Sequence, residues 1–328
     1  MTRKVVVTDY TFPDLERECA AARAAGARLR AHQCKSPGEV ADAVRGADIA
    51  IVQFAELDAD AIAGLAPGAA IIRYGIGYDN IDVRAAGARN HPVGYVPDYC
   101  PDEVADHTAA SLLAMLRKLP ALDASVRRNE WAAVAVAAPL KPFSDTRIGF
   151  FGFGQIARGV HRRLAPFGFA FAAADPALAA QKAGQFGIDK VDADALFATC
   201  DAISLHAPAT EHTVGFVGAA RLSSMRPHAL IVNTARGALI DEDDLAAALR
   251  DGVIGGAALD VFAVEPLPAD SPLRRAPNLL LTPHAAWYSD AAIGRLQGLV
   301  AQDIANHLAG RPLRKPVPGS GPQREAVS

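Results

Sequence analysis

Short apolar, β-branched runs alternate with alanine-rich stretches along the first hundred residues. Five of these runs have the length of a buried strand, and they lie at 4–8, 27–32, 48–53, 69–74 and 92–96. Two of the stretches between them, 13–25 and 37–45, are followed directly by Gly26 and Gly46, and glycine is a usual stop after a helix. The alternation predicts an α/β unit built on five parallel strands.

A second alternating series begins near residue 147. Six further strands are expected, at 147–151, 170–175, 201–206, 229–234, 255–262 and 278–282. Six strands suit a dinucleotide-binding domain. A long apolar helix over 102–119 and an irregular stretch over 120–144 precede this series, and we interpret them as the crossing between two domains.

The last predicted helix, 290–309, is longer than the second domain needs, so we expect it to return to the first domain. The tail beyond Pro312 is rich in Pro, Gly and Ser and is expected to be loose. The sequence therefore predicts one discontinuous domain, 1–100 plus 290–328, and a second domain over 101–289.

Composition narrows the class of protein. With 328 residues, 51% of them hydrophobic, the chain can fill two cores. Its formal net charge of -3 gives no field that would gather nucleic acid or an anionic membrane, so the expected partner is a small molecule. No apolar run has the length of a membrane span or a secretory signal, which predicts a cytoplasmic protein. The four cysteines form no CxxC pair, and we expect neither a metal site nor a disulfide framework.

The most specific local motif is GFGQIA, which follows the predicted strand 147–151 and opens a helix. Gly152 allows a tight turn, and Gly154 lets the backbone approach a pyrophosphate that accepts hydrogen bonds from the amides of Gln155 and Ile156. Asp175 ends the next strand, where a carboxylate can accept both ribose hydroxyls and repel a 2′-phosphate. The motif predicts a dinucleotide site that prefers NAD to NADP.

Three polar clusters follow three predicted strands of the second series. They are NTARG with Arg236, DVFAVEP with Glu265 and TPHAAW with His284. Since carboxyl ends of parallel strands lie at one edge of a sheet, these three side chains can meet. A carboxylate beside a histidine favours the protonated imidazole and fixes its tautomer, while arginine can hold a carboxylate and a carbonyl. The pattern predicts an acid–base site for a small oxo or hydroxy acid.

The order of these motifs resembles the D-isomer-specific 2-hydroxy-acid dehydrogenase family over essentially the whole chain. The segments RYGIGYDNID, NTARGALID and TPHAAWYSD look closest to its C-terminal binding protein branch, although HAPATEHT at 206–213 keeps the proline of ordinary dehydrogenases. The resemblance implies a Rossmann NAD-binding domain inserted into a flavodoxin-like substrate domain, both doubly wound on parallel sheets. It also implies a homodimer that packs through the 102–119 helix and an arm around Trp131.

The resemblance assigns roles to residues. The implied catalytic residues are Arg236, Glu265 and His284, with His284 as the proton donor or acceptor. The implied substrate-binding residues are Arg73, Ile76, Gly77, Arg236 and Trp287, where the glycine loop offers backbone amides to the substrate carboxylate. The implied cofactor-binding residues are Thr108, Gly152, Gly154, Gln155, Ile156, Asp175, His206, Ala207, Pro208, Thr213, Thr234, Ala235, Asp260 and His284, with Asp260 near the nicotinamide amide.

Three functions remain open from the sequence. The leading one is an NAD-dependent oxidoreductase that interconverts a small 2-oxo acid and a D-2-hydroxy acid. The second is an NAD-sensing protein that reports redox state to a protein partner. The third is phosphoglycerate dehydrogenase, which needs additional cations around the substrate phosphate. Retention of Arg236, Glu265 and His284 favours an enzyme over a sensor.

Overall fold

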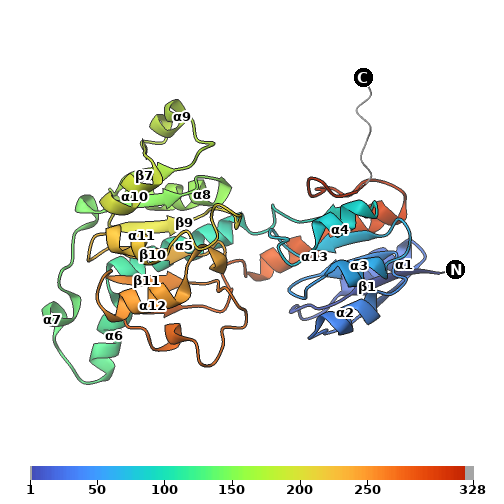
Figure 1. Cartoon of the computed structure of the whole chain (residues 1–328), viewed down its shortest axis with the longest axis horizontal. Coiled ribbons are helices and arrows are strands. Elements are labelled where there is room, and N and C mark those ends of the chain that lie inside the picture. Colours follow the sequence, from blue (N-terminus) through green and yellow to red (C-terminus); the bar gives the residue numbers. More distant parts are fainter. Residues whose placement is uncertain (1, 322–328) are drawn as a thin grey trace. The chain divides into compact units, whose positions relative to one another are not determined.

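A computed structural model describes residues 2–321 of the chain and divides it into two compact units (Figure 1). Unit 1 comprises residues 1–100 and 289–328, and unit 2 comprises residues 101–288. Each unit contains one fully parallel sheet with helices on its faces, which confirms the expected α/β class.

The five-stranded sheet of unit 1 has the order β2-β1-β3-β4-β5. Its strands are β1 (Arg3–Val7), β2 (Ala27–Ala31), β3 (Ile49–Val52), β4 (Ala70–Arg73) and β5 (Val93–Gly94). This is the flavodoxin-like order, which reverses direction between β1 and β3. The loops after β1 and β3 therefore lie at the reversal, where open α/β sheets bind ligands, and the loop after β4 lies next to the loop after β3.

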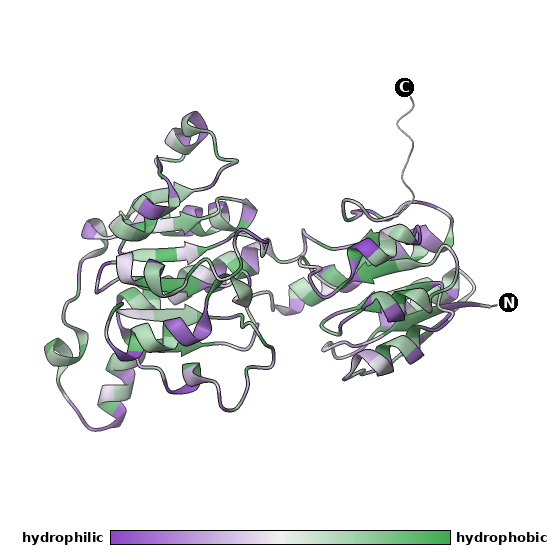
Figure 2. Cartoon of the chain, in the orientation of Figure 1, coloured by the Kyte–Doolittle hydropathy of each residue, from purple (hydrophilic) through white to green (hydrophobic). Residues whose placement is uncertain are grey.

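The helices of unit 1 cover the buried central strands, which Figure 2 shows as continuously hydrophobic. They are α1 (Glu16–Ala24), α2 (Pro37–Val44), α3 (Ala59–Ala63), α4 (Val83–Ala88) and α13 (Asp290–Leu308). Ser36, Asp58, Asp82 and Ser289 cap the first turns of α2, α3, α4 and α13 through their side chains. Helix α13 belongs to this unit.

The segment after α13 is better packed than its composition suggests. Leu313 and Val317 are buried, and Val317 donates its amide to the Val93 carbonyl, so this segment extends the edge at β5. The expectation of a loose tail directly after Pro312 is therefore wrong up to residue 321, because apolar side chains spaced along the segment find the β5 edge. The rest of that tail lies outside the described residues.

Unit 2 has a seven-stranded sheet with the order β12-β11-β10-β9-β6-β7-β8. The strands are β6 (Arg147–Phe151), β7 (Ala170–Ala174), β8 (Asp189–Lys190), β9 (Ala202–Leu205), β10 (Leu230–Asn233), β11 (Gly256–Leu259) and β12 (Leu279–Leu281). The order in which successive strands are added to the sheet reverses between β6 and β9, as in a Rossmann fold. Strand β8 was not predicted, because it is two exposed polar residues long and has no hydrophobic pattern.

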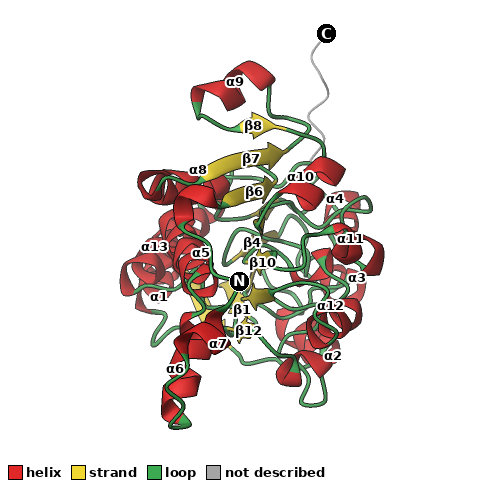
Figure 3. Cartoon of the chain, turned by 90° about the vertical axis from the view of Figure 1, so that its left-hand side faces the viewer, coloured by secondary structure: helices red, strands yellow, loops and turns green. Residues whose placement is uncertain are grey.

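Two cores fill the two faces of this sheet. One lies under α10 (Ala193–Thr199), α11 (Ala219–Ser224) and α12 (Glu242–Arg250), and the other under α5 (Pro101–Leu116) and α8 (Gln155–Leu164). Helix α9 (Ala180–Gln185) lies beyond the β8 edge, as Figure 3 shows. The sheet is thus covered on both faces, which leaves the strand ends for ligands.

The sequence predicts an irregular segment between α5 and β6, but this segment contains two helices. They are α6 (Leu119–Arg127) and α7 (Ala133–Ala137), and a 3₁₀ turn over Phe143–Asp145 follows. Together residues 119–142 form an arm that extends from the rest of unit 2 (Figure 1). Its helices were missed because Pro120 and the Pro-rich end of the arm break the pattern that identifies longer helices.

Candidate active site

The glycine loop joins β6 to α8 at the reversal of the sheet. Gly152 has φ 87°, and a Cβ there would lie 2.9 Å from the carbonyl carbon of His206, so only glycine fits. A Cβ at Gly154 would meet no atom within 4 Å, so open space lies above the start of α8. Helix α8 has no side-chain cap at this end, and its first amides can donate to an anion. The loop therefore fits a dinucleotide pyrophosphate.

Asp175 follows β7 and braces this loop. Its Oδ2 accepts from the amide of Phe153 at 2.7 Å, and its Oδ1 accepts from the amide of Ala177 at 2.7 Å. The side chain is half-buried at the carboxyl end of β7, beside the glycine loop. A carboxylate fixed in this position can still accept ribose hydroxyls, because each oxygen has a second lone pair.

The segment after β9 forms a compact turn on the other side of the glycine loop. His206 Nε2 lies 2.8 Å from Ser204 Oγ, and burial lowers the pKa of His206 to about 3, so the imidazole is neutral. The Thr213 hydroxyl donates to the Pro208 carbonyl and accepts from the Thr210 amide. The Ala207 amide nitrogen also lies close to Gly152, 3.0 Å from where a Cβ would be. These contacts give the turn a defined shape beside the expected cofactor.

The loop after β10 carries Arg236 and is held from within. The Asn233 side chain accepts from the Ala235 amide and donates to the Arg236 carbonyl, and the Arg236 guanidinium donates to the Ala235 carbonyl at 2.6 Å. A Cβ at Gly237 would lie 1.9 Å from the carbonyl carbon of Phe262. Glycine at this position thus lets the Arg236 loop pack directly on the backbone that leads to Glu265.

Glu265 and His284 form a close pair. His284 Nδ1 lies 2.6 Å from Glu265 Oε2, and Glu265 Oε1 accepts from the Phe262 amide at 2.9 Å. Burial raises the pKa of the Glu265 carboxyl, but the hydrogen bond and charge of His284, the Phe262 amide and the charge of Arg236 outweigh burial and lower it below its usual value. Glu265 is therefore an anion at neutral pH and can balance an imidazolium.

Asp260 holds the turn that presents His284. Its Oδ1 accepts from the Thr282 hydroxyl at 2.6 Å and from the Ala285 amide at 2.8 Å, and its Oδ2 accepts from the Ala286 amide at 2.9 Å. His284 has φ 52°, a left-handed conformation that a non-glycine residue holds only in well-determined surroundings. Asp260 supplies those surroundings.

Helix α5 contributes two adjacent residues to these loops. Thr108 lies 2.7 Å from Thr234 Oγ1 in the Arg236 loop, and His107 Nε2 lies 3.2 Å from Thr282 Oγ1 in the His284 turn. Thr108 was assigned through the family resemblance, whereas His107 was missed. No local motif marks His107, since its partner is 175 residues away in the sequence.

The remaining predicted substrate-binding residues of unit 1 are Arg73, at the end of β4, and Ile76 and Gly77, in the loop after it. Trp287 belongs to unit 2. Gly75 has φ 139°, and a Cβ there would lie 1.6 Å from Arg73 Nη1, which itself donates to the Tyr74 carbonyl. Ile76 and Gly77 are half-buried, and among residues 2–321 neither of their amides has a hydrogen-bond acceptor. The loop therefore offers donors suited to a carboxylate. Trp287 is half-buried next to the end of unit 2 and contacts Tyr288 edge to face.

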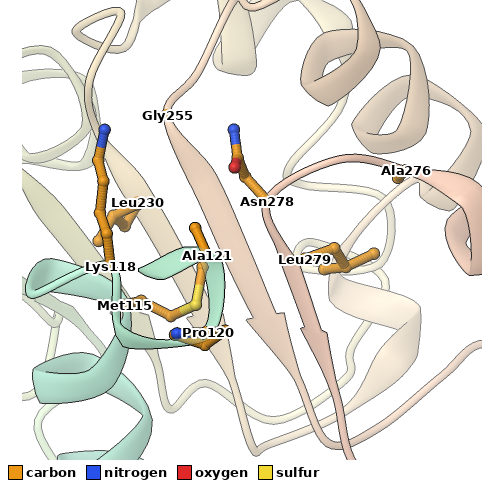
Figure 4. Close-up of a pocket in the computed structure, with 9 residues that line it drawn as sticks. All are labelled: Met115, Lys118, Pro120, Ala121, Leu230, Gly255, Ala276, Asn278 and Leu279. Atoms are coloured by element: carbon orange, nitrogen blue, oxygen red, sulfur yellow. The ribbon is translucent and has the colours of Figure 1, made fainter. Parts of the chain in front are cut away.

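A cavity of about 230 Å³ in unit 2 lies away from these residues (Figure 4). Met115, Lys118, Leu230, Gly255 and Asn278 are among its lining residues, and the last three precede or begin strands β10, β11 and β12. The cavity thus lies at the amino ends of the strands, opposite the carboxyl ends that carry the candidate site. Within the described range, no group of three or more His, Cys, Asp or Glu side chains could hold a metal ion.

The strand order, the glycine loop and Asp175 define unit 2 as a dinucleotide-binding domain. Residues 109–286 match the family described as D-isomer specific 2-hydroxyacid dehydrogenase, NAD binding domain. The chain belongs to the D-isomer specific 2-hydroxyacid dehydrogenase family. This confirms the family that the sequence motifs resemble, while the C-terminal binding protein branch stays a prediction.

Several known proteins are similar to this chain. A D-3-phosphoglycerate dehydrogenase of Mycobacterium tuberculosis is 38% identical over 269 residues, which cover 82% of this chain and 50% of that protein. A glyoxylate reductase of Korarchaeum cryptofilum is 34% identical over 236 residues, 71% of each chain. The crystal structure of the NADPH-dependent glyoxylate/hydroxypyruvate reductase of Sinorhizobium meliloti, in complex with NADP and malonate, is 27% identical, covers 100% of both chains and has a TM-score of 0.83. The chain spans about half the length of the phosphoglycerate dehydrogenases that it matches.

Proposed function

We propose that the protein is an NAD-dependent dehydrogenase that interconverts a small 2-oxo acid and the corresponding D-2-hydroxy acid. The observation that carries the proposal is the 2.6 Å contact between His284 and Glu265, where the backbone leading to Glu265 packs against Gly237, the residue after Arg236. A histidine with an anionic partner at a strand-end crevice of a dinucleotide-binding domain is suited to acid–base work on a carbonyl or hydroxyl.

The contact between His284 and Glu265 involves only one of the two ring nitrogens of His284, so the two nitrogens have different roles. Glu265 engages Nδ1, so Nε2 is the nitrogen that can reach a substrate oxygen. In reduction, His284 gives its Nε2 proton to the carbonyl oxygen and becomes neutral, with Nδ1–H donating to Glu265. In oxidation, neutral His284 takes the hydroxyl proton and Glu265 balances the resulting positive charge. Solvent restores the starting protonation state after each turnover.

The remaining residues bind and orient the substrate. Arg236 offers a planar pair of donors to the substrate carboxylate and carbonyl oxygen. In unit 1, the amides of Ile76 and Gly77, with Arg73, are suited to a carboxylate, and in unit 2 Trp287 supplies an apolar wall. These assignments rest on the resemblance and, for the unit 1 loop, on the amides of Ile76 and Gly77, which have no acceptor among residues 2–321.

NAD would be held by the glycine loop and by the loops after β7, β9 and β10. Gly152 and Gly154 leave room for the pyrophosphate, the amides of Gln155 and Ile156 donate to it, and Asp175 accepts from the ribose hydroxyls. When bound, the reduced cofactor supplies a hydride to the carbonyl carbon. Asp175 also supports a preference for NAD over NADP, since a 2′-phosphate would meet its negative charge.

A second candidate substrate is favoured by one specific observation. The D-3-phosphoglycerate dehydrogenase of Mycobacterium tuberculosis is 38% identical to this chain, so a phosphorylated hydroxy acid belongs in the substrate panel. Glyoxylate and hydroxypyruvate belong there because two other relatives carry the names of their reductases. An NAD-sensing role without turnover, as in the C-terminal binding protein branch, is the alternative from a different class.

One experiment separates these functions. NADH oxidation is followed at 340 nm with glyoxylate, pyruvate, hydroxypyruvate and 3-phosphohydroxypyruvate, for the wild type and for His284→Ala. The proposal expects turnover of at least one 2-oxo acid and its loss in the variant. Preference for 3-phosphohydroxypyruvate would assign the second candidate. Tight NADH binding with no turnover of any acid would favour the sensing role.

We also propose that the protein is a homodimer that packs through α5 and the arm. Five of the ten exposed large hydrophobic side chains identified in the described residues belong to segment 119–140, with Trp131 at 93% and Val134 at 82% exposure. Such a concentration of apolar surface is typical of a protein interface. A two-fold contact would bury the same surface on both subunits.

A further inference from the structure

His107 lies on α5 next to the turn that carries His284. Its Nε2 is 3.2 Å from Thr282 Oγ1 and 3.8 Å from Asp260 Oδ1. The His107 side chain is 26% exposed, whereas Asp260 is 1% exposed. His107 thus contacts one side of a buried carboxylate from helix α5.

The hydrogen-bond directions fix the proton on His107. A hydroxyl has one hydrogen, and the Thr282 hydroxyl donates it to Asp260 Oδ1 at 2.6 Å. Thr282 Oγ1 can therefore only accept from His107, so His107 carries a hydrogen on Nε2 and donates it. The result is a chain of donors from His107 to Thr282 to Asp260.

The same carboxylate determines the backbone on both sides of His284. Asp260 accepts from the amides of Ala285 and Ala286, and its carbonyl oxygen accepts from the His284 amide at 2.8 Å. His284 itself is in the left-handed region, so its orientation depends on these contacts. A residue that fixes the positions of Thr282 and Asp260 therefore also fixes the orientation of the His284 imidazole.

We propose that His107 is a positioning residue for His284, acting through Thr282 and Asp260. This rests on the proposed function of His284 as the proton donor and acceptor. His107 touches neither reacting atom; it supplies the hydrogen bond that orders the Thr282 hydroxyl toward Asp260. Together with Thr108, which contacts Thr234, it makes one dipeptide of α5 the common support of the loops that carry His284 and Arg236.

The test compares two substitutions at His107 with a matched control. His107→Leu removes the donor, whereas His107→Gln keeps a side-chain N–H that can reach Thr282 Oγ1. His228→Leu is the control, because His228 also contacts an aspartate, Asp201 at 2.7 Å, with similar exposure of 33%, but at the amino ends of the strands. Thr282→Val serves as a second probe of the same chain, which guards against a folding defect caused by leucine at 107.

The expected results separate positioning from general packing. In His107→Leu and Thr282→Val, kcat falls about tenfold, the effect of one lost hydrogen bond, while KM for NADH changes less than about threefold. His107→Gln recovers most of kcat, and His228→Leu leaves kcat within about twofold of the wild type. Unchanged kcat in both His107→Leu and Thr282→Val would overturn the proposal, as would equal loss in the leucine and glutamine variants at 107.

Hydrogen–deuterium exchange supplies a readout that does not need turnover. In the cofactor-free protein, the amides of Ala285 and Ala286 exchange about tenfold faster in His107→Leu than in the wild type or in His107→Gln. Unchanged exchange in this segment would contradict the proposal, even if the wild type reduced no 2-oxo acid. Absence of turnover in the wild type with faster exchange in His107→Leu would overturn the proposed function alone, leaving His107 as the support of the turn.

Discussion

His284 Nδ1 and Glu265 Oε2 lie 2.6 Å apart on loops that follow two neighbouring strands, β12 and β11. The lowered pKa of Glu265 keeps its carboxylate ionised through the neutral range, so a negative charge faces His284 whenever the enzyme works. In the proposed mechanism, this charge balances the positive charge that His284 carries before it gives up its proton, and the contact at Nδ1 leaves Nε2 for the substrate.

The pair predicts different pH profiles for two variants. His284→Ala removes the proton donor, and the rate of reduction should fall about 10²–10⁴-fold at every pH. Glu265→Gln keeps the imidazole but removes its counter-charge, so reduction should persist at acidic pH and decline at a lower pH than in the wild type. Single-turnover NADH oxidation from pH 5 to 9 measures both. A profile in Glu265→Gln that coincides with the wild-type profile would show that the two residues do not act as an acid–base pair.

Asp175 predicts the cofactor preference. NADH should bind more tightly than NADPH, and Asp175→Ala should narrow the difference mainly by weakening NADH binding, because the variant loses both the ribose contacts and the brace on the Phe153 amide. Fluorescence titration gives both dissociation constants. Asp189→Ala is the control, since Asp189 lies on the neighbouring strand β8 but is 72% exposed and paired with Arg147. Equal affinities for the two cofactors in the wild type would refute the assignment.

Substitution of Asp201 is expected to lower the stability of the fold without lowering kcat. This 4% exposed carboxylate accepts from Lys141, Arg226, His228 and the Arg147 amide at the amino end of β9. Burial raises its pKa, but those donors outweigh burial and hold the pKa well below its usual value. The contribution of Asp201 to the free energy of unfolding is therefore fully present above about pH 4, the pKa of an aspartate in the unfolded chain. This contribution is lost as the pH falls further.

Asp201→Asn should destabilise the protein by about 3 kcal/mol at pH 7, because Lys141 and Arg226 lose their anion, while kcat at 25 °C stays close to the wild-type value. Thermal unfolding at pH 7 and pH 3 measures the effect, and the gap between wild type and variant should shrink at pH 3. The exposed Asp123–Arg127 pair on α6 supplies the control, and Asp123→Asn should leave the melting temperature unchanged.

The arm predicts how subunits associate. Trp131→Ser combined with Val134→Ser should raise the dimer dissociation constant at least about 30-fold, equivalent to ~2 kcal/mol, because both side chains lose an apolar partner surface. Sedimentation velocity across a concentration series measures it. Phe167→Ser is a surface control, since Phe167 is 46% exposed but lies outside the arm. A monomeric wild type at micromolar concentration would reject the proposed dimer.

The sequence predicts those parts of the fold that are encoded over short distances. Buried parallel strands appear as apolar runs, and the glycine loop follows from Gly152 and Gly154 because their backbone demands are local. The position of the catalytic candidates at strand ends follows from the same reasoning, since each polar cluster directly follows a strand. The family resemblance adds the residues of the unit 1 loop.

Other features depend on contacts between distant segments, and no local pattern reveals them. Val317 is buried because it finds the β5 edge, although its neighbours Pro316, Pro318 and Gly319 suggest a loose chain. Helices α6 and α7 are short and partly exposed, so their apolar side chains give no clear periodicity. His107 is a lone histidine in an alanine-rich helix, and only the fold brings it to Thr282.

The missing side chain at Gly237 has a consequence for directed evolution of this protein. With Phe262 backbone where a Cβ would be, any library that diversifies position 237 separates the Arg236 loop from the segment leading to Glu265. Selections for new substrates should therefore retain glycine at position 237. The loops that carry Arg236 and Glu265 are thus expected to be retained together, while residues that determine the choice of substrate can vary.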